Sequence, residues 1–354
     1  MKRLICLTTL LIISFANISQ AADKANLRSV YRLMDQKNYE SAVDKLETLV
    51  ARYPKDADAR YQYGLALLRN NQFDDSIKAN KALIELAPSY QKYANFNIGI
   101  AYAGLGKDEK AVKLIQKSMH DGYINYDRLK TEEGLKTIRQ QGHFEFSPEQ
   151  KYQEFTAYNR IKVPYTTLLP QNYDSNKTYK GMVAFPPGNY GEASADWMIE
   201  KLLDNKENTE WIITVVLAPE NGLINHPSHH ALNDLMKHQR KQFKLADNKF
   251  HFLGYHSGGS PAATYSQMSS SYVNGLTTIG NYYWENWSDS NLADFDKVPT
   301  HLFVGEKDLD GIRINQKVYD IFKKSNEQVK LKIFDGNSAR ITDLENGMLF
   351  KYLK

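Results

Sequence analysis

Cysteine is almost absent from this sequence: its 354 residues include one, Cys6. A chain with a single thiol cannot close an internal disulfide, and it has no set of thiolates to hold zinc. A lipid-anchoring cysteine follows the apolar part of a leader peptide, whereas Cys6 lies near the start of an apolar run, so lipidation is not expected. We therefore expect no disulfide, no cysteine nucleophile and no Cys-ligated zinc, and we predict neither a bound metal nor another cofactor.

A strong charge of either sign is also missing. The sequence has 45 Lys and Arg residues against 41 Asp and Glu residues, a formal net charge of +4. Nucleic acid and anionic lipid are bound through clustered positive charge, so neither is an expected partner. Beyond the first 15 residues no apolar run approaches the roughly 18 residues that cross a bilayer, so no membrane span is expected.

The first 21 residues have the pattern of a secretory signal peptide. Lys2 and Arg3 precede an apolar run from Leu4 to Phe15, and Ser19-Gln20-Ala21 offers the small residues that a signal peptidase reads. Removal of residues 1–21 would leave no cysteine, and 43 basic residues against 41 acidic ones, a formal charge of +2. The prediction is a soluble periplasmic or secreted protein.

The remaining chain is long enough for about two domains, at roughly 150 residues each, and its 42% hydrophobic residues suffice for a core. The first of them, residues 22–122, repeats itself. Tyr39 and Phe73 are 34 residues apart, and so are Pro54 and Pro88. In a third copy Gly64-Leu65-Ala66 recurs as Gly99-Ile100-Ala101, and one position is shared by small residues, Ala42, Ser76 and Ala111.

This period and these residue types resemble tetratricopeptide repeats, in which each unit is a pair of helices. Small residues are expected where the two helices cross, and proline is expected to end the second helix. The resemblance implies an all-α superhelix whose concave face holds a protein or peptide partner. The alternative is that the three units only pack against a neighbouring domain or mediate dimerisation.

Residues 123–158 are expected to close the array and lead to the next domain. Leu129, Leu135 and Ile138 have near-helical spacing, typical of a capping helix. Ser147-Pro148-Glu149-Gln150 then reads as a capping box with proline at the first helical position, where a new helix would start.

Residues 159–354 show the pattern of an α/β domain with a mostly parallel sheet. Short apolar, β-rich runs are separated by helical stretches, an alternation that implies a sheet covered on both faces. The predicted strands are 182–185, 212–217, 250–254, 276–279, 302–305 and 331–334.

Four ordered segments of this domain resemble the α/β-hydrolase esterases related to polyhydroxybutyrate depolymerases and feruloyl esterases. They are Pro164–Pro170 with Tyr173, Phe185-Pro186-Pro187-Gly188, Leu217-Ala218-Pro219 with Gly222, and Phe252-Leu253-Gly254-Tyr255-His256-Ser257-Gly258-Gly259. The resemblance implies an α/β-hydrolase sheet with a nucleophile on a strained strand-to-helix turn, flanked two residues away on each side by small residues.

That turn can be placed in two registers. If Ser257 were the nucleophile, the crowded flanks would be Tyr255 and Gly259, whereas a turn centred on His256 has Gly254 and Gly258 as flanks. The second register satisfies the sterics and places histidine where the family has serine. Because an acyl-imidazole needs another base to form and discharge usefully, the nucleophile is predicted to be missing.

The resemblance places the triad acid at Asp308, after the predicted strand 300–305. The triad histidine would follow the last strand, where the chain reads Phe334-Asp335-Gly336-Asn337-Ser338-Ala339-Arg340, and His301 is the last histidine in the sequence. In the family, a His-Gly pair follows the strand that leads into the second of these segments. This chain has Pro186-Pro187 at that place, and prolines have no N–H groups to donate to an oxyanion.

Three other interpretations of these residues remain. A histidine from residues 226–256 could serve a rearranged Ser257 as base, which would make the domain an active serine esterase or peptidase. The trio His226, His229 and His230 could instead hold a metal ion. Asp308-Leu309-Asp310-Gly311 resembles the opening of a calcium loop, although Tyr319 stands at the twelfth position, where a glutamate is expected.

Several aromatic residues lie near the predicted carboxyl ends of strands, where ligands bind in open α/β sheets. They are Tyr190, Trp197, Tyr255, Tyr282, Tyr283, Trp284 and Trp287. A retained pocket would use Gly188, Asn189, Tyr190 and Tyr255 to bind a small ligand. The alternative is that 282–287 only cover the sheet, leaving a protein-interaction module without a pocket.

The sequence thus predicts an exported tetratricopeptide repeat protein with a non-catalytic α/β-hydrolase-like domain, acting as a binding or scaffold module. Three predicted losses motivate this hypothesis. His256 stands in place of the nucleophile, no histidine follows Asp308 to act as base, and Pro186-Pro187 cannot donate to an oxyanion.

Overall fold

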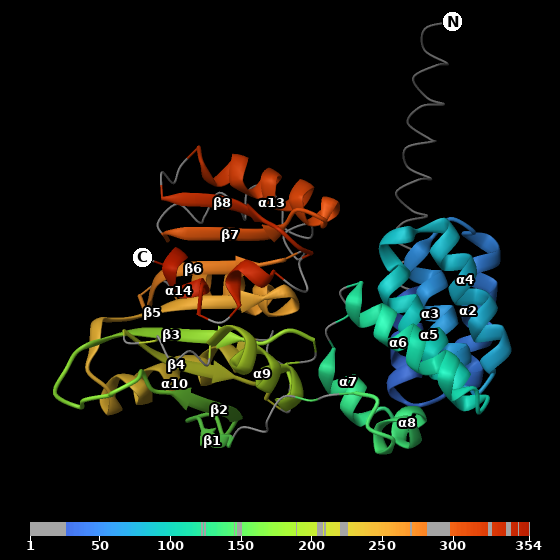
Figure 1. The fold of residues 1–354 in the computed structure, drawn as a ribbon, viewed down its shortest axis with the longest axis horizontal. Coiled ribbons are helices and arrows are strands. Elements are labelled where there is room, and N and C mark those ends of the chain that lie inside the picture. The colour runs from blue at the N-terminus through green and yellow to red at the C-terminus, as the bar shows by residue number, and fades with distance from the viewer. Residues whose placement is uncertain are drawn as a thin grey trace, which may run out of the picture. The chain divides into compact units, whose positions relative to one another are not determined.

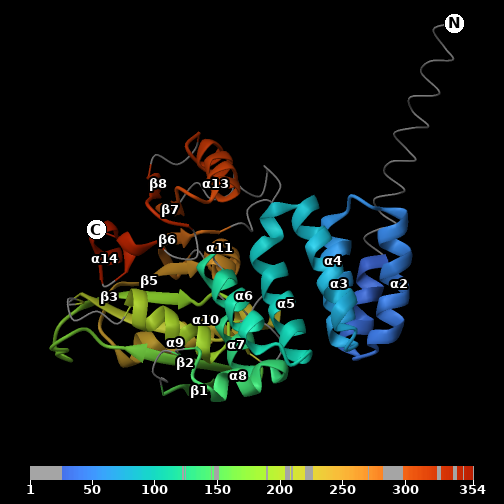
Figure 2. The same cartoon turned by 45° about the vertical axis from the view of Figure 1, so that its right-hand side comes forward.

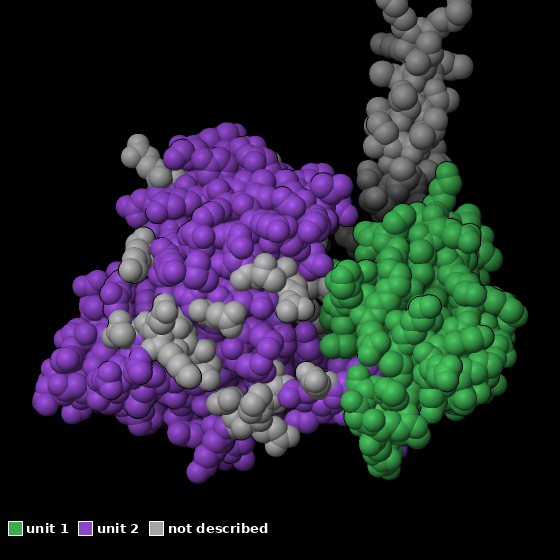
Figure 3. Space-filling view, in the orientation of Figure 1, with its two compact units in different colours: residues 1–123, 134–143 green, residues 124–133, 144–354 purple. Residues whose placement is uncertain are grey.

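The computed structural model describes residues 26–353, apart from residues 122, 124, 145, 147–150, 189, 204–207, 209, 220–225, 270, 282–297, 325–327, 338–340 and 346 (Figure 1). The predicted signal peptide and the predicted capping box at 147–150 lie outside the described residues. The chain divides into two compact units (Figure 3). We call residues up to 123 with 134–143 the repeat domain, and residues 124–133 with those from 144 onward the α/β domain.

The repeat domain consists of helices whose boundaries follow the predicted period. After helical residues 26–35, the chain forms α2 (Tyr39–Arg52), α3 (Ala57–Arg69), α4 (Phe73–Leu86), the 3₁₀ turn η1 (Pro88–Tyr90), α5 (Gln91–Gly104), α6 (Asp108–His120) and α8 (Lys136–Gln140). The helices α2 and α4 begin 34 residues apart, and so do α3 and α5. Figure 2 shows them side by side as a stack of pairs.

The predicted small residues lie where helices cross. Ala42, Ser76 and Ala111 are fully buried, and a Cβ atom on Gly64 would lie 2.5 Å from the Asn80 side chain. A Cβ atom on Gly99 would lie 2.6 Å from Ile115. Because interiors are close-packed, larger residues at these positions would push the helices apart. The prediction of a tetratricopeptide array is confirmed.

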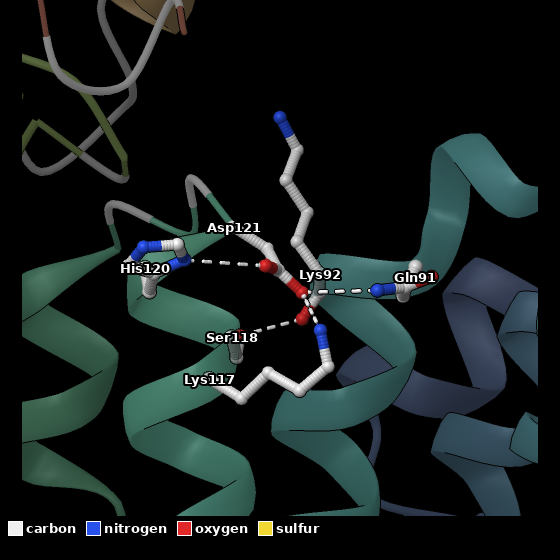
Figure 4. Close-up of polar contacts among 6 residues, drawn as sticks. All are labelled: Gln91, Lys92, Lys117, Ser118, His120 and Asp121. Carbon is white, nitrogen blue, oxygen red and sulfur yellow. Dashed lines mark hydrogen bonds and ion pairs between the residues drawn. The ribbon is translucent and has the colours of Figure 1, made fainter. Parts of the chain in front are cut away.

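The carboxylate of Asp121 ties the end of α6 to the start of α5 (Figure 4). Its Oδ2 atom accepts hydrogen bonds from Gln91 Nε2 (3.0 Å) and Lys117 Nζ (2.6 Å), and His120 Nδ1 lies 3.5 Å from Oδ1. Burial raises the pKa of Asp121, but the bonds from Lys117 and Gln91 outweigh burial and hold the pKa below its ordinary value. This clasp joins the two helices of the third repeat.

The α/β domain is built on one eight-stranded sheet. Its strands are β1 (Gln153–Thr156), β2 (Lys162–Leu168), β3 (Tyr179–Phe185), β4 (Trp211–Val216), β5 (Leu245–Tyr255), β6 (Val273–Ile279), β7 (Thr300–Gly305) and β8 (Val329–Phe334). They lie in the order β1-β2-β4-β3-β5-β6-β7-β8. From β4 to β8 all neighbours are parallel, whereas β2 is antiparallel to both β1 and β4.

Helices cover both faces of this sheet, as its apolar strands require. The core on one face includes residues of α10 (His226–Gln242), α11 (Gly259–Met268) and α13 (Leu309–Phe322). The core on the other includes residues of α9 (Glu192–Met198), the π-helical turn Ile199–Leu203 and α14 (Leu349–Tyr352). Shorter elements are α7 (Tyr126–Thr131), η2 (Glu133–Leu135), η4 (His256–Gly258) and η6 (Thr342–Leu344).

The mostly parallel sheet agrees with the prediction: five of the six predicted strands lie within observed strands, and the sixth, 212–217, extends one residue beyond the end of β4. The antiparallel strands β1 and β2 were not predicted. Within the described part of the chain, no helix combines the length and apolar character needed to cross a membrane.

Two histidines lie buried in the sheet, on β5 and β7. His251 Nε2 is 2.8 Å from Thr277 Oγ1, and the ring centroids of His251 and His301 are 6.4 Å apart. Burial, with smaller contributions from His301 and Lys180, lowers the pKa of His251 to about 3. Burial and Lys330 lower the pKa of His301 to about 4. Both rings are therefore neutral at pH 7.

These low pKa values make the stability of the α/β domain depend on pH. As pH falls below about 6.5, the unfolded chain binds protons that the folded chain does not, so the free energy of unfolding decreases until the folded-state pKa values are reached. Each ring contributes a slope of up to about 1.4 kcal/mol per pH unit. We predict that a His251→Asn, His301→Asn variant loses less stability than the wild type between pH 7 and 4.5.

Tryptophan fluorescence during urea unfolding measures this difference, since all four tryptophans follow residue 196. The matched control is His230→Gln, because the His230 side chain is exposed, and it should keep the wild-type slope. Equal pH dependence in the double variant and the wild type would contradict the account.

Candidate functional site

The chain makes a sharp turn between β5 and α11. The strand ends at Tyr255, the 3₁₀ turn η4 follows, and α11 begins at Gly259. His256 has φ 50°, in the left-handed region that non-glycine residues rarely adopt. A strained strand-to-helix turn of this kind presents the nucleophile in α/β-hydrolases, and here His256 occupies its tip.

The backbone around the turn leaves no room for side chains two residues before or after His256. A Cβ atom on Gly254 would lie 2.4 Å from the carbonyl oxygen of Gly258. A Cβ atom on Gly258 would lie 2.1 Å from the carbonyl oxygen of Phe185, at the end of β3. Both obstacles are backbone atoms, so no side-chain movement relieves them. These contacts centre the turn on His256 and not on Ser257.

Ser257 lies one residue past the tip and is held by the loop that follows β3. Its Oγ atom donates a hydrogen bond to the carbonyl oxygen of Gly188 (3.0 Å), while the Tyr190 hydroxyl donates to the carbonyl oxygen of Ser257 (3.2 Å). A serine hydroxyl has one proton to donate. In this geometry the proton of Ser257 is directed to a backbone carbonyl.

The loop after β3 supplies few of the donors that an oxyanion hole needs. Pro186 and Pro187 are buried and have no N–H groups. Gly188 and Tyr190 have φ values of 68° and 59°, and the Tyr190 N–H bonds back to Pro187 (3.3 Å). The predicted ligand residue Asn189 lies outside the described residues.

The loops after β7 and β8 meet at the same edge of the sheet. Glu306 N–H donates to Phe334 (2.7 Å) and Lys307 N–H to Gly336 (2.9 Å). Gly305 has no space for a side chain, since a Cβ atom there would lie 2.6 Å from Asn337. The acid and base of a hydrolase triad come from these two loops. In the loop after β8, residues 335–337 are described and include no histidine, and residues 338–340 lie outside the described residues.

Asp308, at the acid position, is buried and caps a helix. Its Oδ1 atom accepts a hydrogen bond from the Gly311 N–H (3.0 Å) in the first turn of α13. Since α13 begins at Leu309, the segment is a helix and not a calcium-binding loop. Among the described residues no group of three His, Cys, Asp or Glu side chains could hold a metal ion.

Two of the histidines proposed as substitute bases, His229 and His251, lie within hydrogen-bond distance of other hydroxyl groups. His229 Nε2 lies 2.8 Å from Ser269 Oγ and 3.2 Å from Asn233 Nδ2, and its ring stacks on Tyr265. His251 is bound to Thr277 within the sheet. His230 is exposed, and the side chain of His226 lies outside the described residues.

The predicted aromatic residues have different surroundings. Tyr255 and Trp197 are buried, and their rings pack against each other with centroids 5.2 Å apart, so both belong to the core. Tyr190 is half-buried over the turn. The predicted group at 282–287 lies outside the described residues. Binding of a ligand by Gly188 and Tyr190 stays a prediction.

Sequence reasoning missed Asp127 of α7. Its carboxylate accepts hydrogen bonds from the backbone of Gly191 (3.2 Å) and Ala193 (2.9 Å) and from Ser194 Oγ (2.6 Å). It lies more than 60 residues before the helix that it caps, so no local sequence pattern marks it. Asp127 holds the far end of the loop that carries Gly188 and Tyr190.

Comparison with protein families matches a tetratricopeptide repeat model to residues 27–91. Comparison with curated proteins finds no match. The chain thus combines a segment that matches tetratricopeptide repeats with a mostly parallel eight-stranded sheet that carries a strained strand-to-helix turn at His256.

Solved structures similar to the chain include esterases and hydrolases. A thermostable esterase is 12% identical over 52% of this chain, which spans about half (54%) of that protein, with a TM-score of 0.42. Naproxen esterase (carboxylesterase NP) of Bacillus subtilis is 11% identical over 65% of this chain and 98% of its own, with a TM-score of 0.43. Dienelactone hydrolase of Anabaena variabilis is 15% identical over 55% and 92%, with a TM-score of 0.40.

We predict that Gly258→Ala lowers the free energy of unfolding of the α/β domain by at least about 2 kcal/mol, because the methyl group would overlap the Phe185 carbonyl. Urea unfolding followed by tryptophan fluorescence measures the change. Thr264→Ala is the control, a substitution of a half-buried residue in α11, the helix that follows the turn. Wild-type stability in Gly258→Ala would show that the turn is built differently.

Proposed function

We propose that this protein is a non-catalytic binding or scaffold protein, in which tetratricopeptide repeats engage a protein or peptide and an α/β-hydrolase-like domain serves for binding. The observation that carries the proposal is His256 at the tip of the turn between β5 and α11. The tip residue is the one that attacks the substrate in an α/β-hydrolase. An imidazole in that place needs a second base to form and discharge an acyl intermediate.

Two further features support a non-catalytic function. Pro186 and Pro187 remove N–H donors from the loop that contributes to the oxyanion hole, and loss of one such donor costs on the order of 10²-fold or more in rate. The carboxylate at the acid position, Asp308, binds the first turn of α13. A single compensating substitution would not restore nucleophile, base and oxyanion donors together.

A protein or peptide partner for the repeats is supported by a row of tyrosine rings. Tyr61, Tyr90, Tyr93 and Tyr123 follow one another with ring centroids 5.8, 6.3 and 6.0 Å apart. Three of them, from α3, η1 and α5, are half-buried, and Tyr123 is buried. Large, rigid aromatic side chains are enriched where proteins bind one another. The row therefore favours the repeats as the interaction surface.

The proposal is tested by comparing turnover of short-chain aryl esters by the wild type, Ser257→Ala and His256→Ser. We expect Ser257→Ala to equal the wild type, since any residual hydrolysis does not depend on that hydroxyl. His256→Ser alone should gain no activity, because the base and the oxyanion donors would still be lacking. Loss of turnover in Ser257→Ala would establish a serine hydrolase, and a burst with His256→Ser would show that a base and oxyanion donors are present.

We further propose that the protein is exported with removal of residues 1–21, on the strength of the charged, apolar and small-residue segments at its start. Intact-mass measurement of the protein recovered from the periplasm or medium of an expressing bacterium should give a chain that begins at Ala22. Recovery of the uncleaved chain from the cytoplasm alone would contradict export.

A further inference from the structure

Three tyrosine rings of the repeat domain are in mutual contact. Tyr61 of α3 and Tyr93 of α5 have ring centroids 6.1 Å apart, and Tyr90 of η1 lies 5.8 Å from the first and 6.3 Å from the second. The ring planes are inclined by 47° to 68°, so no ring of the three lies flat on another. All three residues are half-buried, and we call them the tyrosine cluster. The cluster therefore keeps part of its aromatic surface exposed.

A carboxylate lies at the edge of the tyrosine cluster. Asp58 is one turn before Tyr61 in α3, which places both residues on one face of the helix. Its Oδ1 atom accepts a hydrogen bond from the Tyr90 hydroxyl, and Asp58 is nevertheless exposed. Because a carboxylate has two oxygens and about four acceptor sites, one such bond leaves Asp58 able to accept further donors. The cluster thus combines aromatic surface with an accessible negative charge.

Asp56 adds to the negative charge beside the tyrosine cluster. It caps α3, since its Oδ1 atom accepts a hydrogen bond from the Ala59 N–H (2.9 Å). Burial, the bond to Asp58 and the charge of Asp58 raise the pKa of Tyr90, and Asp56 raises it further. Burial, Asp58 and Asp56 also raise the pKa of Tyr31, an exposed residue of the first helix. The negative potential at these rings favours a cationic ligand.

One cation already lies over the tyrosine cluster. Lys92 Nζ is 5.3 Å from the centroid of the Tyr93 ring, a distance at which an ammonium group is attracted to an aromatic face. Figure 4 shows the Lys92 side chain pointing away from the clasp around Asp121, while its backbone carbonyl accepts a hydrogen bond from Ser118 Oγ (2.5 Å). The ring can therefore hold a cation, and a cationic ligand would compete with Lys92.

The geometry of the cluster favours arginine over a free ammonium ion. Aromatic rings with centroids about 4.5–7 Å apart are in direct contact, so these three rings leave no gap between them that would enclose a small quaternary ammonium ion. A guanidinium group needs no such gap, because it is planar, stacks on one ring face and donates paired hydrogen bonds to a carboxylate. The tyrosine cluster and Asp58 offer both kinds of contact.

We propose that the tyrosine cluster and Asp58 bind a peptide segment of a partner protein that carries arginine side chains. This inference rests on the proposed function, since it names the chemistry of the partner that the repeats engage. An arginine of the partner stacks on an exposed tyrosine face and donates to Asp58, and the ammonium group of Lys92 moves away from Tyr93 to admit it. Lys92 therefore opposes binding, and salt weakens binding by screening Asp56 and Asp58.

Fluorescence anisotropy of three labelled ten-residue peptides, titrated with the full chain, tests the ligand class. The peptides alternate serine with arginine, with lysine or with glutamate. We expect the arginine peptide to bind at least about tenfold more tightly than the glutamate peptide and about threefold more tightly than the lysine peptide, because only guanidinium combines stacking with paired hydrogen bonds. Equal affinity for the arginine and lysine peptides, a preference for glutamate, or no binding of any peptide would overturn the proposal.

Variants of the full chain locate the binding surface. Tyr93→Leu should raise the Kd of the arginine peptide about three- to tenfold, whereas Tyr93→Phe keeps the ring and should bind like the wild type. Asp58→Asn should raise the Kd about two- to fivefold. Asp74→Asn is the matched control and should have no effect, since Asp74 is the second residue of α4 as Asp58 is of α3. Far-UV circular dichroism checks that each variant is folded.

Lys92→Gln gives a result of opposite sign. Without the ammonium group the Tyr93 ring is open to the ligand and a like charge is gone, so the Kd of the arginine peptide should fall about two- to fivefold. Weaker binding by Lys92→Gln, or equal affinity in Tyr93→Leu and the wild type, would overturn the proposal.

Failure of this inference is distinct from failure of the proposed function. A preference for the glutamate peptide would overturn the arginine ligand alone and leave the repeats as an interaction surface. Ester turnover that depends on Ser257 would instead contradict the proposed function, whatever the peptides do.

Discussion

The approach of Gly258 to the end of β3 is the constraint on which the candidate site depends. A Cβ atom at Gly258 would lie 2.1 Å from the Phe185 carbonyl oxygen, and one at Gly254 would lie 2.4 Å from the Gly258 carbonyl oxygen. With both positions restricted to glycine, the turn between them has its tip at His256. The turn therefore has the steric pattern that α/β-hydrolases use to present a nucleophile, with a histidine at its tip where they have serine.

Much of the fold could be predicted because it depends on local periodicity. The 34-residue period located the helix pairs, and the apolar runs located β3 to β8. The sequence pattern did not predict β1 and β2, for physical reasons. β1 has four residues, three of them exposed, and β2 contains Pro164, which argues against a strand on sequence grounds. Only the pairing of β2 with β4 shows that it belongs to the sheet.

The site could be predicted where local sterics decide, and not where distant segments meet. The two glycines around His256 were sufficient to choose the register of the turn. The burial of Tyr255 against Trp197 and the capping of α13 by Asp308 required the structure. The capping of α9 by Asp127 could not be predicted either, because Asp127 and the residues it binds are far apart in the sequence.

The absence of a serine nucleophile is the central claim, and intact-mass spectrometry after treatment with a fluorophosphonate tests it most directly. The reagent forms a stable adduct only with a serine whose hydroxyl is activated by a base. With Ser257 directed to the Gly188 carbonyl and His256 at the tip, the account predicts that the protein keeps its unmodified mass. A stoichiometric adduct at Ser257, absent from Ser257→Ala, would contradict it.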